Sequence, residues 1–108
     1  MNSMKENVIR PIIDENGKMI YATKHLNHTV IFNINEGPKV VDFTLNDIEN
    51  FASDKSLFRV HKSYIVNINS IAEIKMRANG LTARLYSGKT IPVSKRRKNL
   101  LLEHLNIK

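Results

Sequence analysis

The segment that decides the fold reads Phe58-Arg59-Val60-His61-Lys62-Ser63-Tyr64-Ile65-Val66-Asn67. Its apolar and polar side chains alternate at first, which is typical of a β-strand with one buried face. If the pleat continued unbroken, Lys62 would point inward together with Val60 and Tyr64. An unpaired lysine is seldom buried, so we expect a turn or kink at residues 61–63 that directs Lys62 to solvent.

Downstream of this segment we expect three more strands and a helix. The strands are predicted at residues 71–76, 81–86 and 90–93. They are joined by turns that contain Gly80 and Gly88, because glycine favours turns. A short C-terminal helix is predicted over about 95–105, with Leu101, Leu102 and Leu105 on one face.

Upstream of it the pattern is also mostly β. Strands are predicted at residues 19–23, 28–34 and 39–43. One short helix is expected over about 45–53, because Leu45, Ile48 and Phe51 recur at helical spacing. Thr44 and Asp47 resemble a capping box at its start. The fold class is therefore mostly β, antiparallel, with two short helices.

The first seventeen residues form a separate N-terminal segment in this interpretation. Residues 8–13 are apolar, but Pro11 interrupts them, which favours an edge strand. A turn with two acidic residues is expected at residues 14–17, and it ends in Asn16-Gly17, a dipeptide typical of hairpin turns. We expect one domain overall, with residues 18–108 as its main part.

Charge narrows the class of partner. The chain has 108 residues, a net charge of +7 and no cysteine, which excludes disulfide scaffolds and thiolate sites. Residues 1–56 hold six basic and eight acidic side chains (−2), and residues 57–108 hold eleven and two (+9). No apolar run approaches the ~20 residues that a membrane helix needs, and no signal peptide is recognisable. We expect a cytoplasmic domain that binds a polyanion and is not embedded in a membrane, while the charge asymmetry by itself fits both nucleic acid and a membrane surface.

The start of the C-terminal helix carries the densest positive charge. Ser94 is a suitable N-cap, and Lys95, Arg96, Arg97 and Lys98 follow it directly. Cations at a helix N-terminus are disfavoured by about 0.3–1 kcal/mol each unless an anion docks there. We expect a helix end that faces phosphate, and the alternative is a solvated basic patch.

Other residue types argue against catalysis and metal binding. His25 and His28 have ligand-like spacing, but neither cysteine nor clustered carboxylates supply further ligands. His28 is either a plain loop residue or one that bonds to a base edge or phosphate. His61 and Ser63 lack an orienting carboxylate and a nucleophile elbow, so no enzyme activity, cofactor or small-molecule substrate is expected.

The aromatic side chains are expected mostly in the core. This group comprises Tyr21, Tyr64, Tyr86 and four phenylalanines, most of them in predicted strands. RNA and single-stranded DNA are recognised by exposed aromatic residues among basic ones. The pattern therefore disfavours those two ligands.

From Phe58 onward the chain resembles the LytTR-type DNA-binding domain of bacterial response regulators. The resemblance is carried by residues 58–67, by Ile71, Ile74, Leu85 and Gly88, and by Ile91-Pro92-Val93-Ser94-Lys95-Arg96. More loosely, it extends over residues 18–105. It implies an elongated antiparallel β-fold that binds duplex promoter DNA through loops. Such domains reach successive major grooves, usually at paired direct repeats.

Carried over by position, the resemblance implies base contacts at His28, Lys62, Lys95 and Arg96. We expect phosphate contacts from Lys89, Arg97 and Lys98, with His61 and Ser63 beside Lys62. Whether Lys62 reads a base or only phosphate stays open. A homodimer on direct repeats is expected from the family.

Three further questions stay open at the level of sequence. No receiver domain precedes the motif, so the chain is either a stand-alone regulator or an excised output domain. A protein-interaction module that modulates another regulator is one alternative function. A basic RNA-binding β domain is another.

Overall fold

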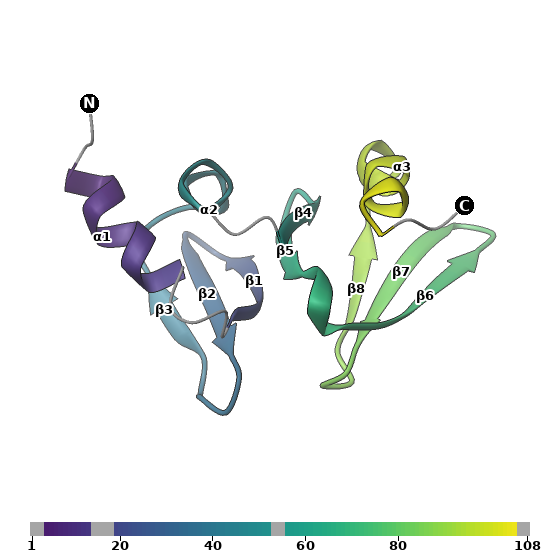
Figure 1. The fold of residues 1–108 in the computed structure, drawn as a ribbon, viewed down its shortest axis with the longest axis horizontal. Coiled ribbons are helices and arrows are strands. Elements are labelled where there is room, and N and C mark those ends of the chain that lie inside the picture. Colours follow the sequence, from purple (N-terminus) through teal and green to yellow (C-terminus); the bar gives the residue numbers. More distant parts are fainter. Residues whose placement is uncertain (1–3, 14–18, 53–55, 106–108) are drawn as a thin grey trace.

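The computed structural model describes residues 4–13, 19–52 and 56–105 and arranges them in two antiparallel sheets and a few short helices (Figure 1). The helices are α1 (Met4–Ile13), α2 (Leu45–Phe51), α3 (Lys95–His104) and the 3₁₀ turn η1 (Ile68–Ser70). The strands are β1 (Met19–His25), β2 (His28–Asn33), β3 (Lys39–Val41), β4 (Leu57–His61), β5 (Tyr64–Asn67), β6 (Ile71–Arg77), β7 (Gly80–Leu85) and β8 (Thr90–Val93). The strands predicted from residue 19 onward are confirmed, with ends that differ by a few residues.

The two sheets differ in size. The larger has the strand order β3-β2-β1-β5-β4, and the smaller has the order β6-β7-β8. Together with the helices they extend over 43 × 30 × 27 Å. The expected elongated, mostly β architecture is confirmed, and the two sheets follow one another along the longest dimension (Figure 1).

The five-stranded sheet supports two separate cores, one on each face. Ala22 and Ile65 pack into the first core, whereas their chain neighbours Tyr21 and Val66 pack into the second. Neighbouring side chains on a strand point to opposite faces, so one sheet can serve both. This arrangement fixes the register of β1 against β5, because a slip of one residue would exchange the two faces.

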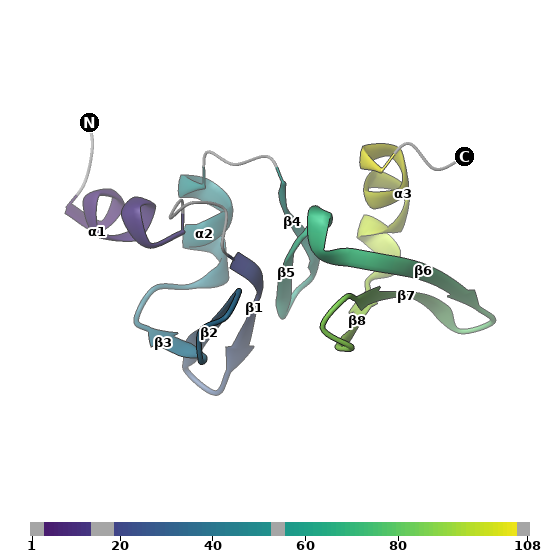
Figure 2. The same ribbon diagram turned by 60° about the horizontal axis from the view of Figure 1, so that its bottom comes forward.

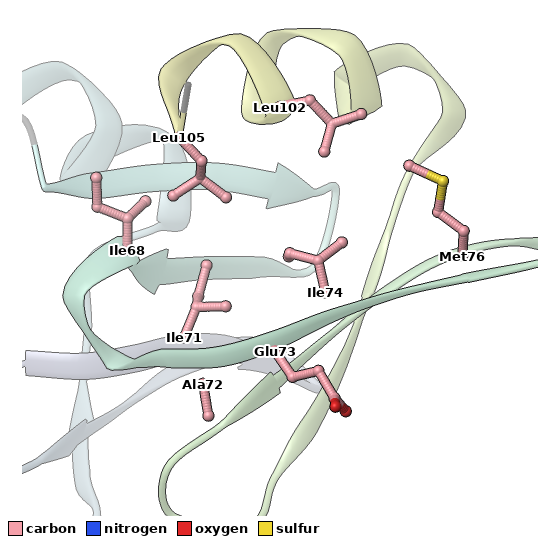
Figure 3. Close-up of a pocket in the computed structure, with 8 residues that line it drawn as sticks. All are labelled: Ile68, Ile71, Ala72, Glu73, Ile74, Met76, Leu102 and Leu105. Atoms are coloured by element: carbon pink, nitrogen blue, oxygen red, sulfur yellow. The ribbon is translucent and has the colours of Figure 1, made fainter. Parts of the chain in front are cut away.

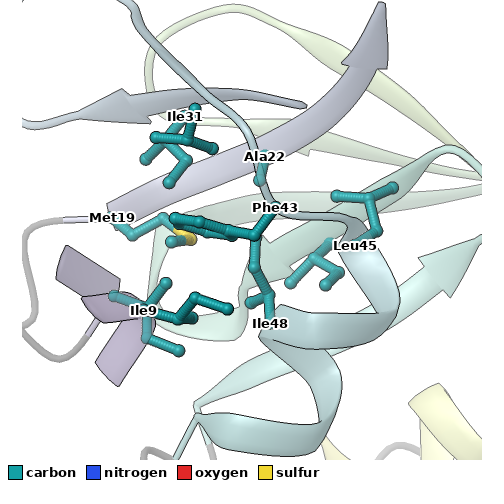
Figure 4. Packing of buried hydrophobic residues seen from close by; sticks show 10 residues of the cluster. Ile9, Met19, Ala22, Ile31, Phe43, Leu45 and Ile48 are labelled. Atoms are coloured by element: carbon teal, nitrogen blue, oxygen red, sulfur yellow. The ribbon is translucent and has the colours of Figure 1, made fainter. Parts of the chain in front are cut away.

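Helices α1 and α2 close the first core (Figure 4). Its buried members are Ile9, Ile13, Met19, Ala22, Ile31, Val41, Phe43, Leu45, Ile48 and Ile65. The predicted capping box of α2 is confirmed. The Thr44 Oγ1 accepts from the Asp47 N–H at 3.1 Å, and the Thr44 N–H donates to Asp47 Oδ2 at 2.9 Å. The helix ends at Phe51 rather than Ser53.

The predicted edge strand at residues 8–13 is wrong, because these residues belong to helix α1. Ile9 and Ile13 are four residues apart, so a helix places both on one side, where they are 1% and 3% exposed. Pro11 is exposed and lies in the last turn, and its missing N–H removes a single helical bond, the one to the carbonyl of residue 7. The free energy gained by burying the two isoleucines therefore exceeds the cost of placing a proline in the helix. The turn predicted at residues 14–17 lies outside the described residues.

The smaller sheet and α3 form the second core with β4 and β5. Its buried members are Tyr21, Val60, Val66, Leu81, Ala83, Leu85, Ile91, Val93 and Leu101. Leu102 and Leu105 pack against it, so the predicted apolar face of α3 is confirmed. Tyr86 is a correction to the expectation of core aromatics, because it follows β7 and is 76% exposed.

The break predicted at residues 61–63 is confirmed. The strand β4 ends at His61, and β5 begins at Tyr64 in the opposite direction. The register shifts between Arg59 and His61, and Lys62 is exposed at the turn. The ammonium group of Lys62 is thereby kept in water, as the cost of burying an unpaired charge requires.

The packing of α1 can be tested with two neighbouring residues. Ile9→Ala should lower the free energy of unfolding by about 2–5 kcal/mol, because it leaves a cavity in the first core. Val8→Ala is the matched control, since Val8 is 61% exposed. It should change stability by no more than about 0.5 kcal/mol. Equal effects in urea unfolding would show that α1 does not pack in this orientation.

Candidate nucleic-acid interface

Three connections project from the same side of the molecule. They are the β1–β2 turn at Leu26 and Asn27, the β4–β5 turn at Lys62 and Ser63, and the β8–α3 junction at Ser94. In Figure 2 both hairpin turns point downward, and α3 begins at its lower end. The structure thus brings together the regions in which the sequence predicted His28, Lys62 and Lys95.

His28 and Lys62 line one shallow groove of about 210 Å³. Lys24 and Asn27 from the β1–β2 hairpin line it too, and so does Asn46 from α2. Both Lys24 and Asn27 are exposed, and neither was singled out from the sequence. Their positions follow only from the pairing of β1 with β5, which sets one hairpin beside the other.

Hydrogen bonds hold these two turns together. The Ser63 carbonyl accepts from the Thr23 hydroxyl at 3.0 Å and from the Lys24 N–H at 3.1 Å. The Ser63 N–H donates to His61 Nδ1 at 3.1 Å. The His61 ring also packs edge-on against Tyr64, with 5.8 Å between ring centroids. The predicted phosphate contacts His61 and Ser63 therefore also determine the shape of the turn.

The β8–α3 junction is attached to β4. The Ser94 N–H donates to the Val60 carbonyl at 2.9 Å. Ser94 occupies the predicted N-cap position, but its hydroxyl does not cap α3. The Ser94 Oγ atom is buried and has no hydrogen-bond partner among the described residues. The N-terminal amides of α3 therefore have no side-chain cap from Ser94, and such amides bind anions.

The four basic residues that begin α3 are not equivalent. Lys95, Arg96 and Lys98 are exposed. The Arg97 side chain is 30% exposed and lies 3.6 Å from Glu49 Oε2. Its Nη1 also donates to the Arg59 carbonyl at 3.2 Å. Part of the Arg97 guanidinium is therefore used inside the protein.

The β6–β7 hairpin extends the basic surface beyond α3. A groove of about 390 Å³ is lined by Arg77 and Asn79 of the hairpin and by Lys95, Lys98 and Asn99 of α3. From the sequence, Arg77 is only one of the basic residues of the second half, and Asn79 is expected in a turn. Contact with the start of α3 is what makes both candidates for binding.

Lys89 lies at the opposite end of β8 from the basic start of α3. It precedes β8, whereas Lys95 follows it, so the strand separates the two residues. The Lys89 Nζ atom lies 5.9 Å from the ring centroid of Tyr21 and 6.0 Å from that of Tyr64. Tyr21 in turn stacks on Phe32 at 4.4 Å. The structure therefore places Lys89 over an aromatic cluster and not beside the basic start of α3.

The described ranges offer neither a metal site nor a membrane-spanning helix. No group of three or more His, Cys, Asp or Glu side chains there could hold a metal ion. His25 and His28 face each other across the β1–β2 hairpin. No helix among the described residues is long and apolar enough to cross a membrane.

Comparison with known proteins gives consistent results. The sequence model of the LytTr DNA-binding domain family matches residues 12–106. A response regulatory protein of Vibrio vulnificus (strain CMCP6), itself uncharacterised, is 42% identical over 53 residues. That match covers 48% of this chain and 22% of the relative, so this chain spans much less than the relative's full length.

A solved structure shares the fold. It is the LytTr DNA-binding domain of a Bacillus cereus protein described as a methyl-accepting/DNA response regulator. The TM-score is 0.75 at 23% sequence identity, with 83% of each chain covered.

The aromatic cluster under Lys89 predicts a response to alkaline pH. Burial raises the pKa of Tyr21 above its ordinary value of 10.0, and charge on Tyr64 raises it further. The unfolded chain therefore loses this proton at lower pH than the folded chain, so stability falls as pH rises above about 10. Tyr21→Phe should lose less stability than the wild type between about pH 8 and pH 11, measured by urea unfolding. An identical loss in both proteins would contradict this assignment.

Proposed function

Because this chain belongs to the LytTR DNA-binding domain family, we propose that it binds promoter DNA sequence-specifically as the output domain of a bacterial response regulator. In this proposal three loops contact the duplex, and no recognition helix enters a groove lengthwise. A regulator of this kind acts on chromosomal DNA, so we propose that it works in the cytoplasm.

The observation that carries the proposal is the gathering of exposed donors on three neighbouring loops. His28 and Lys62 share one groove, and Lys95 lies with Arg77 in another. Lysine, arginine and histidine donate hydrogen bonds to the acceptors that guanine and phosphate present. We assign base contacts to His28, Lys62, Lys95 and Arg96, with Lys62 able to contact phosphate instead.

Phosphate contacts would supply much of the affinity. We assign them to Lys98 and the first two amides of α3, together with His61 and Ser63 at the β4–β5 turn. Both internal contacts of Arg97 use Nη1, so only Nε and Nη2 remain for phosphate and its share is smaller. Lys89 would reach only a phosphate farther along the duplex.

The dimensions suit successive major grooves. The longest dimension is 43 Å, which exceeds the ~34 Å turn of duplex DNA. The β1–β2 hairpin belongs to one sheet and the β6–β7 hairpin to the other, so the two can face consecutive grooves. We propose that two copies occupy paired direct repeats and that a receiver domain regulates them in the full protein.

A specific feature also supports a protein contact. An apolar groove of about 370 Å³ lies between β6 and α3, where Ile71 and Ile74 face Leu102 and Leu105 (Figure 3). Met76 at its margin is 65% exposed. Such surfaces mark interaction sites, so this groove keeps the protein-interaction module as a second candidate function.

The first test is selection of duplexes from a random pool by the purified chain. An enriched motif, repeated at a fixed spacing, is expected. Affinity for it should fall linearly with salt on logarithmic axes, with a slope of about −0.9 for each phosphate neutralised. Binding unaffected by salt would contradict the electrostatic account. Competition by structured RNA as effective as by the selected duplex would favour the RNA-binding alternative.

The second test uses single alanine variants in quantitative binding to the selected duplex. Lys95→Ala and Arg96→Ala should each cost about 1–3 kcal/mol if they read bases, and should relax selectivity at one position. Lys39→Ala is the charge-matched control, because Lys39 begins β3 at the end of the sheet away from the β1–β2 turn. If all three variants bind alike, the assignment of the α3 start is wrong.

A further inference from the structure

Arg59 makes an unusually complete set of contacts directly before the β4–β5 turn. Its side chain is 10% exposed although it carries a charge. The Nε atom donates to the His61 carbonyl at 2.8 Å, and Nη2 donates to the Lys62 carbonyl. These are two successive carbonyls of the turn that presents Lys62.

The other side of the guanidinium is anchored on helix α2. Arg59 Nη1 donates to Asn46 Oδ1 at 2.9 Å and to Glu49 Oε1 at 3.1 Å. Arginine holds its five N–H donors in a rigid plane, so anchoring one end fixes the direction of the others. The orientation of both turn carbonyls therefore depends on the Arg59 guanidinium, which α2 holds in place.

The same residue reaches the second DNA-facing element. The Arg59 carbonyl accepts from Arg97 Nη1 at 3.2 Å, and Arg97 lies 3.6 Å from the Oε2 atom of Glu49. One carboxylate thus pairs with an arginine before the β4–β5 turn and with an arginine in the first turn of α3. Neither the sequence pattern nor the total charge indicates this connection.

We propose that Arg59, together with Glu49 and Arg97, is a positioning network that holds the β4–β5 turn and the start of α3 in one fixed arrangement for DNA. Arg59 itself need not touch DNA, because its donors already point at the two carbonyls and at α2. The inference rests on the proposed function, and it assigns sequence selectivity to a residue that lines the groove of His28 and Lys62 but has only 10% of its side chain exposed.

The informative variant is Arg59→Lys, which keeps the charge but loses the planar fork. Lysine has three donors on a single nitrogen and cannot bridge α2 and two carbonyls in the same way. General attraction to DNA should persist because the net charge is unchanged. Affinity for the selected duplex should fall roughly tenfold or more, the scale of one lost bidentate base contact. Affinity for a scrambled duplex of equal length should stay within about twofold of the wild type.

A control separates positioning from simple loss of stability. Ile31→Val shortens a fully buried side chain in the first core, away from the network. Thermal unfolding curves of Ile31→Val and Arg59→Lys first give a temperature at which both variants are folded. DNA binding by the two variants is then compared at that temperature. Ile31→Val should keep the wild-type ratio of selected to scrambled binding. Glu49→Gln, which keeps the size of the side chain, should lower that ratio in the same direction as Arg59→Lys.

A measurement without DNA tests the structural part of the inference separately from the proposed function. The Ser63 and Lys24 amides donate to His61 Nδ1 and to the Ser63 carbonyl. Their hydrogen exchange should be at least about tenfold faster in Arg59→Lys than in the wild type, with Ile31→Val as control. If exchange and the binding ratio both match the wild type, the positioning network is refuted while DNA binding stands. If wild-type selection enriches no duplex but exchange responds, the proposed function fails and the structural role of Arg59 survives.

Discussion

The whole proposed interface depends on the hydrogen bonds between the end of β4 and the start of α3. The Val60 carbonyl holds the Ser94 N–H, and the Arg59 carbonyl holds Arg97. Two adjacent residues of one strand therefore bind the first turn of α3 from the side. The Arg59 side chain reaches forward into the next turn. Since Val60 is fully buried, this attachment belongs to the second core and not to a loop free to move by itself.

The two cores hold the loops of the proposed interface in place. The five-stranded sheet is covered on one face by α1 and α2 and on the other by the smaller sheet and α3. The β1–β2 and β4–β5 turns both lie at the lower edge of this sheet in Figure 2. Loops alone would lose conformational entropy when they bind DNA. The hydrogen bond from the Thr23 hydroxyl to the Ser63 carbonyl already restricts these loops, so they have less conformational entropy left to lose.

Much of the fold could be predicted from local pattern, and the failures have identifiable causes. The strands, the Thr44 cap and the exposed Lys62 follow from alternation, capping chemistry and the cost of burying charge. Helix α1 was missed because Pro11 weakens the local helical signal, while the packing that rescues the helix involves distant residues. Tyr86 was placed in the core because a strand pattern cannot show where the strand leaves the sheet.

The sequence by itself determined the basic second half, the break at residues 61–63 and the family resemblance, because each depends on residues close together in the chain. Only the tertiary structure decided how that charge is divided. It exposes Lys95 and Arg96, holds part of Arg97 against Glu49, and sets Lys89 over aromatic rings. It also buries Arg59 as an internal donor. A charge acts on a ligand or on its own fold according to what surrounds it, and the surroundings come from contacts between segments far apart in sequence.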